Sequence, residues 1–536
     1  MDMQAMRRGA ARAAATVGAL LAAALLALVV QAAPAHALTS GETGSVTLGN
    51  LEAGTQVEVY KVVDVNWDDA GDQPVSPAYT WTSAVAGWVK ANYPAYVDDS
   101  EGKSGVAEAF GSMGDAASKE FYDKLAAAVS AGTVALDPAK TFTAAAGGTQ
   151  VDGLAMGGYL VLASNSANYV YQPIGVNIEP VYDTAAGAWK LAEGAVQNIE
   201  VKRSPVGIEK TVNGQKVVGA AYGEALDFAL VSPVPAYPEN ASADAKKYGI
   251  FDMMDAGLTF DSSSLRVYGL ASKDQASADA APLVEGTHYT VGATNLAGEA
   301  ATFALDFDYE SIAGFAYIRV EYQGALNENA PIGPAGTENH AKLEFNDDPY
   351  DAGGYATHGD STKVYSYGID VTKVDKADGT TALAGAKFTV ADASGAGISF
   401  AAVDAAAGHY RVVAAGTAGA ITELEVGSTD AAKGRLVIDG LAEGDYSLAE
   451  TQAPGGYTKP SRTFSFAVAD ADARGVLDGK VGESQVGYVT GSIENAKGFE
   501  LPTTGDMGTM GITALGVAAI AAALAVLVRM RRGARR

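Results

Sequence analysis

The sequence contains no cysteine, so no disulfide bond can reinforce the fold. Secreted multidomain proteins often rely on disulfides for that purpose. If this chain is covalently braced, the bracing must use other side chains. Histidine is also scarce: the chain has five histidines, scattered without the spacing of a metal site. We therefore expect no cofactor and no metal site.

The sequence also lacks the short motifs of common enzyme classes. It contains no GxSxG elbow, no P-loop and no dinucleotide-binding fingerprint. Asp64, Asn66 and Asp68 are spaced like the start of a calcium loop, but Asp69 and Val75 stand where that loop needs glycine and glutamate. An EF-hand is excluded, and a looser cation site is the alternative there. We expect a protein that is not an enzyme.

Positive charge is the third deficit. The chain has 37 lysines and arginines against 63 aspartates and glutamates, which gives a formal net charge of −26 at pH 7. Such a surface repels nucleic acid and suits a soluble surface protein whose copies repel one another. We therefore expect no nucleic-acid partner.

The N-terminal segment is typical of a secretion signal. Three arginines precede an Ala/Leu/Val run that extends to Val30, and residues 35–37, Ala-His-Ala, form a small-x-small cleavage site. Residues 1–37 are therefore predicted to be a signal peptide that is removed on export.

The C-terminal segment, residues 499–536, holds a pentapeptide, an apolar run and a basic end, in that order. The pentapeptide consists of Leu501, Pro502, Thr503, Thr504 and Gly505. The run 511–528 carries no charge and is just long enough to cross a bilayer. Five arginines follow it, which places the end of the chain on the cytoplasmic side. We expect a transmembrane helix in the precursor.

Between these ends, alternating apolar and polar residues predict a mainly β fold of tandem immunoglobulin-like sandwiches joined by short turns. The clearest strand patterns are residues 57–62, 228–231, 315–320 and 464–468. Residues 105–131 instead have helical spacing and are rich in alanine, so one or two helices are expected in the first domain.

A repeated passage indicates related domains. Residues 151–159 and 438–446 are identical at six of nine positions, and each is a glycine turn that leads into a strand. Two sandwich domains of related topology explain this repeat. The predicted domains are 38–200, 201–362 and 363–498.

Three polar residues of the third domain lie in phase with apolar neighbours. In a strand, residues two apart share a face. The sets that share a face are Ile369, Val371 and Lys373; Tyr446, Leu448 and Glu450; and Val489, Ile493 and Asn495. Burying any of these polar groups alone is costly, and an unpaired charge most of all. Lys373, Glu450 and Asn495 are therefore expected to meet in the core.

The second domain repeats the pattern with a lysine, an aspartate and an asparagine. Its sets are Val206, Ile208, Lys210 and Val212; Tyr248, Ile250, Asp252 and Met254; and Asn339, Ala341, Leu343 and Phe345. The Lys–Asn separations are similar, 339 − 210 = 129 and 495 − 373 = 122 residues. We expect each pair to link a first strand to a last strand.

Buried together, such groups can react. Desolvation lowers the pKa of a lysine and raises that of an acid, so a proton can pass between them. The neutral amine is a nucleophile, and the protonated acid can hydrogen-bond and polarise the asparagine carbonyl. Attack expels ammonia and leaves a Lys–Asn isopeptide bond in a single self-directed turnover. The alternative is a hydrogen-bonded buried ion pair that does not react.

Several motifs carry a family resemblance. Residues 383–390, LAGAKFTV, and 446–457, YSLAETQAPGGY, resemble the CnaB-type module of Gram-positive adhesins and pilins, and the second matches the pilin E-box, YxLxETxAPxGY, at every fixed position. Residues 201–350 resemble the isopeptide-forming D2 domain of pilus backbone subunits. The markers of that resemblance are Lys210-Thr-Val and residues 248–252, 257–260 and 339–345. With its LPTTG pentapeptide, apolar run and basic tail, the chain resembles an LPXTG-anchored major pilin of the SpaA type.

The resemblance implies a structural role and assigns the site residues. It places Glu450 as the acid of a Lys373–Asn495 bond. It places Asp252 as the acid of a Lys210–Asn339 bond, with Asp255 as a weaker candidate. In the first domain, the aligned repeats put Ala163 where Glu450 stands, so no such bond is expected there.

The resemblance also implies that a sortase cuts between Thr504 and Gly505 and joins Thr504 to another amine. The implied partners are a class C pilin sortase, a housekeeping sortase, other copies of the chain, peptidoglycan, and tip or minor pilins and host matrix. The expected location is the cell-wall surface, in a pilus, after a transient membrane-bound precursor.

Polymerisation needs an amine that receives the threonine. In the pilin family this is a lysine at the end of the first domain, within a WxxxVxVYPK-like motif. The matching place is residues 198–202, which end at Lys202, although the Tyr-Pro pair is missing and Trp189 lies farther upstream than the pattern expects. The alternative is a solvated lysine between domains. The chain would then be a monomeric wall-anchored adhesin that binds host matrix.

Overall fold

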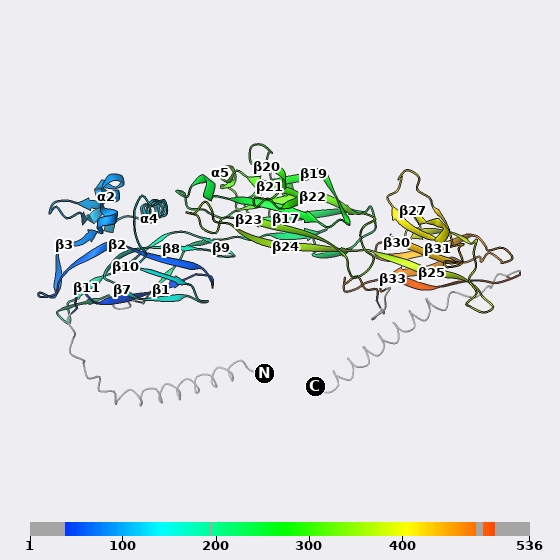
Figure 1. Cartoon of the computed structure of the whole chain (residues 1–536), viewed down its shortest axis with the longest axis horizontal. Coiled ribbons are helices and arrows are strands. Elements are labelled where there is room, and N and C mark those ends of the chain that lie inside the picture. Colours follow the sequence, from blue (N-terminus) through cyan, green and yellow to red (C-terminus); the bar gives the residue numbers. More distant parts are fainter. Residues whose placement is uncertain (1–37, 193–195, 479–485, 499–536) are drawn as a thin grey trace, which may run out of the picture. The chain divides into compact units, whose positions relative to one another are not determined.

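The computed structural model describes residues 38–192, 196–478 and 486–498 (Figure 1). The predicted signal peptide, the LPTTG pentapeptide and the predicted membrane span lie outside these residues. Among the described residues, no helix is long and apolar enough to cross a membrane. The described chain is mainly β, which confirms the predicted fold class.

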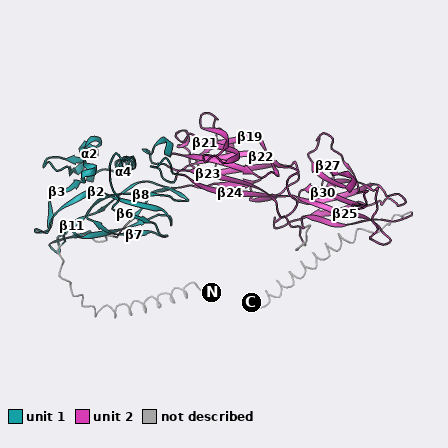
Figure 2. Cartoon of the chain, viewed as in Figure 1, with its two compact units in different colours: residues 1–204, 237–245, 347–354 teal, residues 205–236, 246–346, 355–536 magenta. Residues whose placement is uncertain are grey.

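The chain divides into two compact units, drawn in teal and magenta in Figure 2. Unit 1 comprises the described part of Met1–Ser204 together with Tyr237–Ala245 and Asp347–Gly354, and unit 2 comprises the other described residues. Two short segments of the predicted second domain thus pack with the first domain. The exact domain boundaries stay predictions.

Unit 1 is built on two main sheets. One has the order β13-β1-β7, with β13 (Val196–Glu200), β1 (Thr43–Gly49) and β7 (Thr149–Ala155). The other has the order β10-β8-β2-β3-β5-β4, with β10 (Ile174–Ile178), β8 (Gly157–Ser164), β2 (Gln56–Asp68), β3 (Gln73–Trp81), β5 (Gly105–Val106) and β4 (Val97–Asp98), and β6 (Lys140–Thr143) pairs with β2. A small ribbon joins β11 (Pro180–Asp183) to β12 (Ala188–Leu191). Apolar side chains of β1, β2, β7 and β8 share one core cluster, so these two main sheets enclose it.

Helices pack on the larger sheet of unit 1. The two predicted ones are α3 (Glu108–Gly111) and α4 (Asp115–Ser130). A third helix, α2 (Ser83–Asn92), was missed, although its buried Val85 and Val89 are four residues apart and so lie on one helical face. Both longer helices bury apolar residues in one cluster with Trp81 of β3.

The segments 237–245 and 347–354 are fastened to α4 by one carboxylate. Asp123 is 1% exposed. Its Oδ2 accepts hydrogen bonds from the backbone N and from Nδ2 of Asn240, both at 3.0 Å, and its Oδ1 accepts one from Oη of Tyr350 at 2.7 Å. The buried carboxyl group thus has three hydrogen-bond partners in the two segments, which helps to hold both of them in unit 1.

The first part of unit 2 is a sandwich of a four-stranded and a six-stranded sheet. The four-stranded sheet has the order β15 (Glu209–Val212), β17 (Ala225–Pro233), β22 (Tyr317–Leu326) and β19 (Leu258–Leu270). The six-stranded sheet has the order β16 (Val217–Gly219), β24 (Ala356–Tyr365), β23 (Thr337–Phe345), β18 (Tyr248–Met254), β21 (Ala300–Phe307) and β20 (Tyr289–Thr294). A short helix, α5 (Tyr309–Ile312), follows β21. The strand predicted at 315–320 is β22, which starts later and extends further.

The second part of unit 2 is a smaller sandwich. One sheet has the order β27 (Ser399–Asp404), β28 (His409–Val413), β30 (Arg435–Leu441), β25 (Tyr367–Asp375) and β33 (Tyr488–Asn495). The other has the order β29 (Glu423–Glu425), β26 (Lys387–Asp392), β31 (Gly444–Gln452) and β32 (Phe464–Val468). The first and last strands, β25 and β33, are parallel neighbours.

The repeated passages fold alike. Each carries the chain from one sheet of a sandwich to the other, from β7 to β8 in unit 1 and from β30 to β31 in unit 2. The aligned Gly157 and Gly444 have φ angles of 149° and 151°. The hydroxyls of Tyr159 and Tyr446 each donate to the backbone oxygen four residues earlier, at 2.6 Å and 2.9 Å. The sequence repeat therefore marks a repeated structural corner.

Candidate functional site

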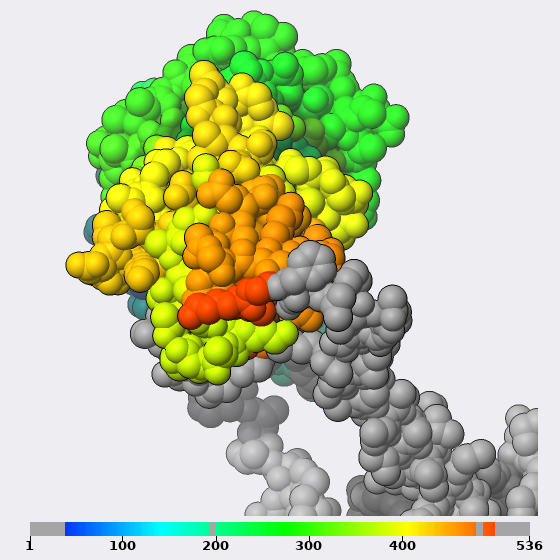
Figure 3. Space-filling view, turned by 90° about the vertical axis from the view of Figure 1, so that its right-hand side faces the viewer, coloured from blue at the N-terminus to red at the C-terminus, as the bar shows by residue number. Residues whose placement is uncertain are grey.

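Lys373, Glu450 and Asn495 meet between the sheets of the smaller sandwich. On the parallel pair β25 and β33, Lys373 lies beside Ile493, and Asn495 lies beside Asp375. Lys373 and Asn495 are therefore diagonal neighbours on one face of a sheet, and Glu450 reaches them from β31 in the facing sheet. In Figure 3, the red C-terminal residues, which include β33, lie against yellow-green residues from the part of the sequence that contains β25.

The three side chains are in direct contact. Nζ of Lys373 lies 2.5 Å from Oδ1 of Asn495 and 3.2 Å from Oε2 of Glu450. Nδ2 of Asn495 donates a hydrogen bond to Oε1 of Glu450 at 2.6 Å. The residues are 1%, 4% and 2% exposed, in the order lysine, glutamate and asparagine. One carboxylate thus contacts both the amine and the amide.

The surroundings favour an uncharged amine. Burial lowers the pKa of Lys373, although the nearby Glu450 carboxylate opposes that shift. The ring centroids of Phe388 and Phe464 lie 5.8 Å and 5.6 Å from Nζ of Lys373. A ring face attracts a cation, so these two contacts oppose the effect of burial, which is the larger one and lowers the pKa.

The second cluster spans the two sheets of the larger sandwich. Lys210 comes from β15 in the four-stranded sheet, opposite Leu230 of β17. Asp252 and Asn339 come from β18 and β23, which are neighbours in the six-stranded sheet. A bond between Lys210 and Asn339 would therefore join the two sheets, whereas the Lys373–Asn495 bond would join two strands of one sheet.

A tyrosine completes the second cluster. Nζ of Lys210 contacts Oδ2 of Asp252 and lies 2.6 Å from Oη of Tyr322, on β22. The Tyr322 hydroxyl donates to Oδ2 of Asp252 at 2.6 Å and accepts a hydrogen bond from Nδ2 of Asn339 at 3.0 Å. Lys210, Asp252 and Asn339 are 0% exposed, and Tyr322 is 2% exposed.

Burial moves both titrating groups of the second cluster toward the uncharged pair. It lowers the pKa of Lys210 and raises the pKa of Asp252, each against the opposing attraction of the partner charge. Burial also holds the pKa of Tyr322 well above its usual range. Within the described residues, Oδ1 of Asp252 and Oδ1 of Asn339 have no hydrogen-bond partner. Each of these two groups therefore uses only one of its two polar side-chain atoms in hydrogen bonds within the cluster.

Two expectations need correction. Asp255 is exposed, and its Oδ2 accepts a hydrogen bond from the backbone N of Glu338 at 2.9 Å, so it lies outside the cluster. We expected each lysine and its asparagine to lie on the first and last strands of their domain. This is so for Lys373 on β25 and Asn495 on β33, but it is wrong for the second domain. There Asn339 lies on β23, and β24 follows it.

Sequence reasoning missed Tyr322 because the strand predicted at 315–320 ended too early. The alternation that begins at Ile318 and Val320 continues to Tyr322 on the buried face. A buried tyrosine hydroxyl needs a hydrogen-bond partner, so a tyrosine in buried phase could have been predicted to bond with the buried polar groups.

Lys202 lies just beyond the end of β13. Its side chain and that of Glu200 are exposed, whereas the intervening Val201 is 1% exposed. The carbonyl oxygen of Lys202 accepts a hydrogen bond from the backbone N of Gln172 at 2.9 Å. The backbone is thus held while the amine faces solvent, as the alternation at these residues predicts. Its role as the acceptor stays a prediction, and the pentapeptide lies outside the described residues.

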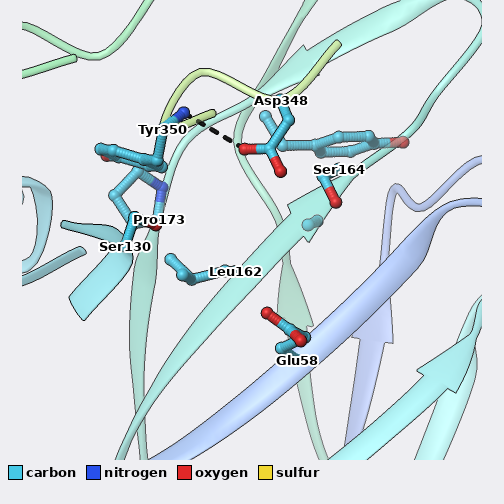
Figure 4. A pocket seen from close by; sticks show the side chains of 9 residues that line it. Glu58, Ser130, Leu162, Ser164, Pro173, Asp348 and Tyr350 are labelled. Carbon is cyan, nitrogen blue, oxygen red and sulfur yellow. Dashed lines mark hydrogen bonds between the residues drawn. The ribbon is translucent and has the colours of Figure 1, made fainter. Parts of the chain in front are cut away.

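A small cavity in unit 1 shows no comparable chemistry. It has a volume of about 30 Å³ and is lined by residues that include Glu58, Ser164, Asp348 and Tyr350. Figure 4 shows the carboxylates of Glu58 and Asp348 at opposite ends, with Asp348 accepting a hydrogen bond from the backbone N of Tyr350. Among the described residues, no group of three or more acidic or histidine side chains could hold a metal ion.

Two family models match the chain. Residues 368–480 match the SpaA prealbumin-like fold domain, and residues 493–534 match the LPXTG cell wall anchor motif. The first match contains Lys373 and Glu450, and the second contains Asn495 and the pentapeptide. The anchor motif makes the chain a cell-wall-anchored surface protein.

The fold is that of a solved structure. The T6 backbone pilin of serotype M6 Streptococcus pyogenes, described as a modular three-domain structure, aligns with a TM-score of 0.54 and 20% identity over 80% of this chain and 81% of that one. The chain has the fold of a backbone pilin. The full-length major pilin SpaD of Corynebacterium diphtheriae aligns with a TM-score of 0.48 and 18% identity over 86% of this chain and 99% of that one.

One curated protein is similar to this chain in sequence. The trypsin-resistant surface T6 protein of Streptococcus pyogenes serotype M6 is 24% identical over 301 residues, which are 54% of this chain and 49% of the relative. The chain thus matches about half the length of that relative.

Proposed function

We propose that this chain is the structural backbone subunit of a sortase-assembled pilus, braced internally by Lys373–Asn495 and Lys210–Asn339 isopeptide bonds. The observation that carries the proposal is the pair of fully buried lysine–acid–asparagine clusters in a chain with a backbone-pilin fold and a cell-wall anchor motif. The chain acts as a structural subunit, and bond formation is a single event in each of the two domains that hold a cluster.

The contacts in the smaller sandwich define the steps. Lys373 passes a proton to Glu450 across 3.2 Å, which leaves a neutral amine and a neutral acid. The cost of burying two charges favours this exchange. Nζ of Lys373 then attacks Cγ of Asn495 beside the oxygen that it already contacts. A new C–N bond forms as the bond from Cγ to Nδ2 breaks.

The same carboxyl group can serve the leaving nitrogen. Nδ2 of Asn495 lies 2.6 Å from Oε1 of Glu450, so the acid can return a proton to it and release ammonia. Of the three hydrogens on the lysine ammonium, one stays in the isopeptide bond and one leaves with ammonia. The third stays on Glu450 or leaves when ammonia departs as ammonium.

Proton transfer also changes which amide orientation is preferred. With charged groups, the amide oxygen faces the ammonium and the amide nitrogen faces the carboxylate, as observed. A neutral acid on Glu450 is a donor, and a neutral amine on Lys373 can accept a hydrogen bond. A half-turn of the Asn495 amide would let the acid donate to Oδ1 and polarise the carbonyl, but it would also move Nδ2 away from Oε1. The steps above therefore use the observed orientation, in which the acid lies beside the leaving nitrogen.

The bonds would act as mechanical braces. Lys373 and Asn495 are 122 residues apart. If the entropic rule for disulfides carries over, closing a loop of this size adds roughly 4–5 kcal/mol to the free energy of unfolding. Under tension, force passes through the covalent link instead of through the hydrogen bonds of the strands.

For assembly, the proposal has a class C pilin sortase cut after Thr504 and join it to Lys202 of another copy. A housekeeping sortase then attaches the finished polymer to peptidoglycan, and tip or minor pilins and host matrix are further partners. The exposed amine of Lys202, on a backbone held by Gln172, supports its role as acceptor. The competing function is a monomeric wall-anchored adhesin, which would need no acceptor lysine.

Immunoblots of cell-wall extracts separate the two functions. We expect a high-mass ladder from the wild type and a single wall-anchored band from Lys202→Ala, because that variant loses only an exposed amine. Lys119→Ala, at an exposed lysine of α4, is the matched control and should keep the ladder. A single band from the wild type would favour the adhesin. A ladder that persists in Lys202→Ala would show that another amine is the acceptor.

A further inference from the structure

The acids of the two clusters differ in reach. Glu450 contacts the lysine through Oε2 and the asparagine through Oε1. Asp252 is one methylene shorter and contacts Lys210, but among the described residues it makes no hydrogen bond with Asn339. In the second cluster the nitrogen that must leave therefore has a different neighbour.

That neighbour is the hydroxyl of Tyr322. It lies 2.6 Å from Nζ of Lys210, 2.6 Å from Oδ2 of Asp252 and 3.0 Å from Nδ2 of Asn339. A single oxygen thus touches the nucleophile, the acid and the leaving nitrogen. Glu450 makes the corresponding contacts in the other cluster with its own two oxygens.

We propose that Tyr322 is a catalytic residue of the second domain, whose hydroxyl relays a proton from Asp252 to the departing nitrogen of Asn339. The inference rests on the proposed Lys210–Asn339 bond and adds a fourth participant to Lys210, Asp252 and Asn339.

The relay balances in atoms and charge. The Lys210 ammonium gives a proton to Asp252, and the neutral amine attacks Cγ of Asn339. As the bond from Cγ to Nδ2 breaks, Tyr322 gives its hydroxyl proton to Nδ2 and takes one from the Asp252 carboxylic acid. Nζ gives its second proton to the carboxylate left on Asp252. Ammonia leaves, Tyr322 ends unchanged, and Asp252 ends protonated.

The fold keeps Tyr322 in place for this role. Its cross-strand partner on β17 is Phe228, and the two rings are stacked with centroids 5.3 Å apart. Phe260 and Phe303 also pack on the Tyr322 ring, with centroids at 5.6 Å and 5.0 Å. Because its pKa is held well above the usual range, the phenol keeps its proton and can donate it in concert with receiving another.

The shorter side chain of Asp252, compared with that of Glu450, suggests a substitution that would compensate for the loss of the Tyr322 hydroxyl. Removing the Tyr322 hydroxyl leaves room beside Asn339, and lengthening Asp252 by one methylene brings a carboxyl oxygen toward the same place. Tyr322→Phe should therefore be compensated by Asp252→Glu, which would convert the second cluster to the arrangement of Lys373, Glu450 and Asn495.

The test follows bond formation in the whole secreted chain, residues 38–500. Unreacted protein from inclusion bodies is diluted from urea, and cross-linked peptides are quantified by mass spectrometry over time. We expect Tyr322→Phe to slow the Lys210–Asn339 link by about 10²–10⁴-fold, the range for general acid catalysis. The Lys373–Asn495 link in the same molecule should form at the wild-type rate and serves as an internal control for refolding.

Two comparisons make the result decisive. Tyr222→Phe removes another buried hydroxyl of the second domain, bonded to the carbonyl of Ala330, and should leave the Lys210–Asn339 rate unchanged. The Asp252→Glu/Tyr322→Phe double variant should recover much of that rate. The inference is overturned if Tyr322→Phe reacts as fast as Tyr222→Phe, or if the double variant stays as slow as Tyr322→Phe. A wild type without the Lys210–Asn339 link would instead overturn the proposed bond itself.

Discussion

Lys210 and Lys373 differ from Lys202 in their contact with water, and this difference separates their chemistry. The first two are 0% and 1% exposed, whereas Lys202 is exposed. Burial lowers the pKa of Lys210 and of Lys373, so each can become a nucleophile without an external base. The Lys202 side chain faces solvent, and the proposal has a sortase use its amine.

The rate of the Lys210–Asn339 reaction should depend on pH in a bell-shaped way. The reactive pair, a neutral amine and a neutral acid, carries as many protons as the ion pair, so its population is constant between the two pKa values. Below the pKa of Asp252 the amine is also protonated and blocked, and above the pKa of Lys210 no acid remains to protonate the leaving nitrogen. Because burial raises the first pKa and lowers the second, the plateau should be narrower than for solvated groups.

The rate is measured by diluting unreacted chain from urea into buffers of different pH and quantifying the cross-linked peptide. A rate that rises steadily with pH, without an alkaline decline, would mean that only amine deprotonation matters and that Asp252 has no role as an acid.

At the residue scale, strand phase alone located most of the two clusters. Burying a lysine, an acid or an asparagine without a polar partner is costly, so these side chains were expected to meet. Phase could not show that Asp252 makes no hydrogen bond with Asn339, because phase gives the face on which a side chain lies but not the register of β18 against β23. Phase could not identify Tyr322 as part of the cluster either, because a tyrosine on a buried face is ordinary in a sandwich core.

At the scale of elements, unit 1 repeats the strand arrangement of the smaller sandwich without its chemistry. In unit 1, β1 lies between the parallel β13 and the antiparallel β7, just as β25 lies between β33 and β30. Ala163 on β8 packs in the core at the place that corresponds to Glu450 on β31. Without an acid at that place, proton transfer to a leaving amide has no donor.

The first domain should therefore be the easiest to unfold or cleave. Limited proteolysis of residues 38–500, followed by mass spectrometry, should show early cuts within 38–200 while the other domains persist. Glu450→Ala is the matched control: it removes one brace and should make the third domain comparably sensitive. Proteolysis that spared residues 38–200 and digested the other two domains first would contradict this expectation.

Some elements could not be foreseen from local pattern. The segments 237–245 and 347–354 show no alternating strand pattern. Their attachment to unit 1 includes hydrogen bonds to the Asp123 carboxylate and one from the backbone N of Asn165 to the backbone oxygen of Asp347. The position of β24 is also a tertiary property. β24 comes after Asn339 in the chain and so lies outside the loop that a Lys210–Asn339 bond would close. Hydrogen bonds to β23 and β16 hold it in the sheet.

At the scale of the whole molecule, the proposed isopeptide bonds would supply the covalent links that a chain without cysteine cannot form as disulfides. A surface protein under tension gains from covalent links between distant parts of the chain, and this sequence cannot use disulfides. In the third domain, the chain enters on β25 and leaves on β33, the two strands that carry Lys373 and Asn495. A bond between them would transmit force from one end of the domain to the other without unfolding it.

Intact-mass measurement of residues 38–500 tests the central claim most directly, because each isopeptide bond releases one ammonia. The account predicts a mass about 34 Da below the sequence mass, about 17 Da for each of two attacks. Glu450→Ala and Asp252→Ala should each restore one increment of about 17 Da by removing the acid of one cluster. A wild-type mass equal to the sequence mass would contradict both bonds and leave the clusters as buried ion pairs.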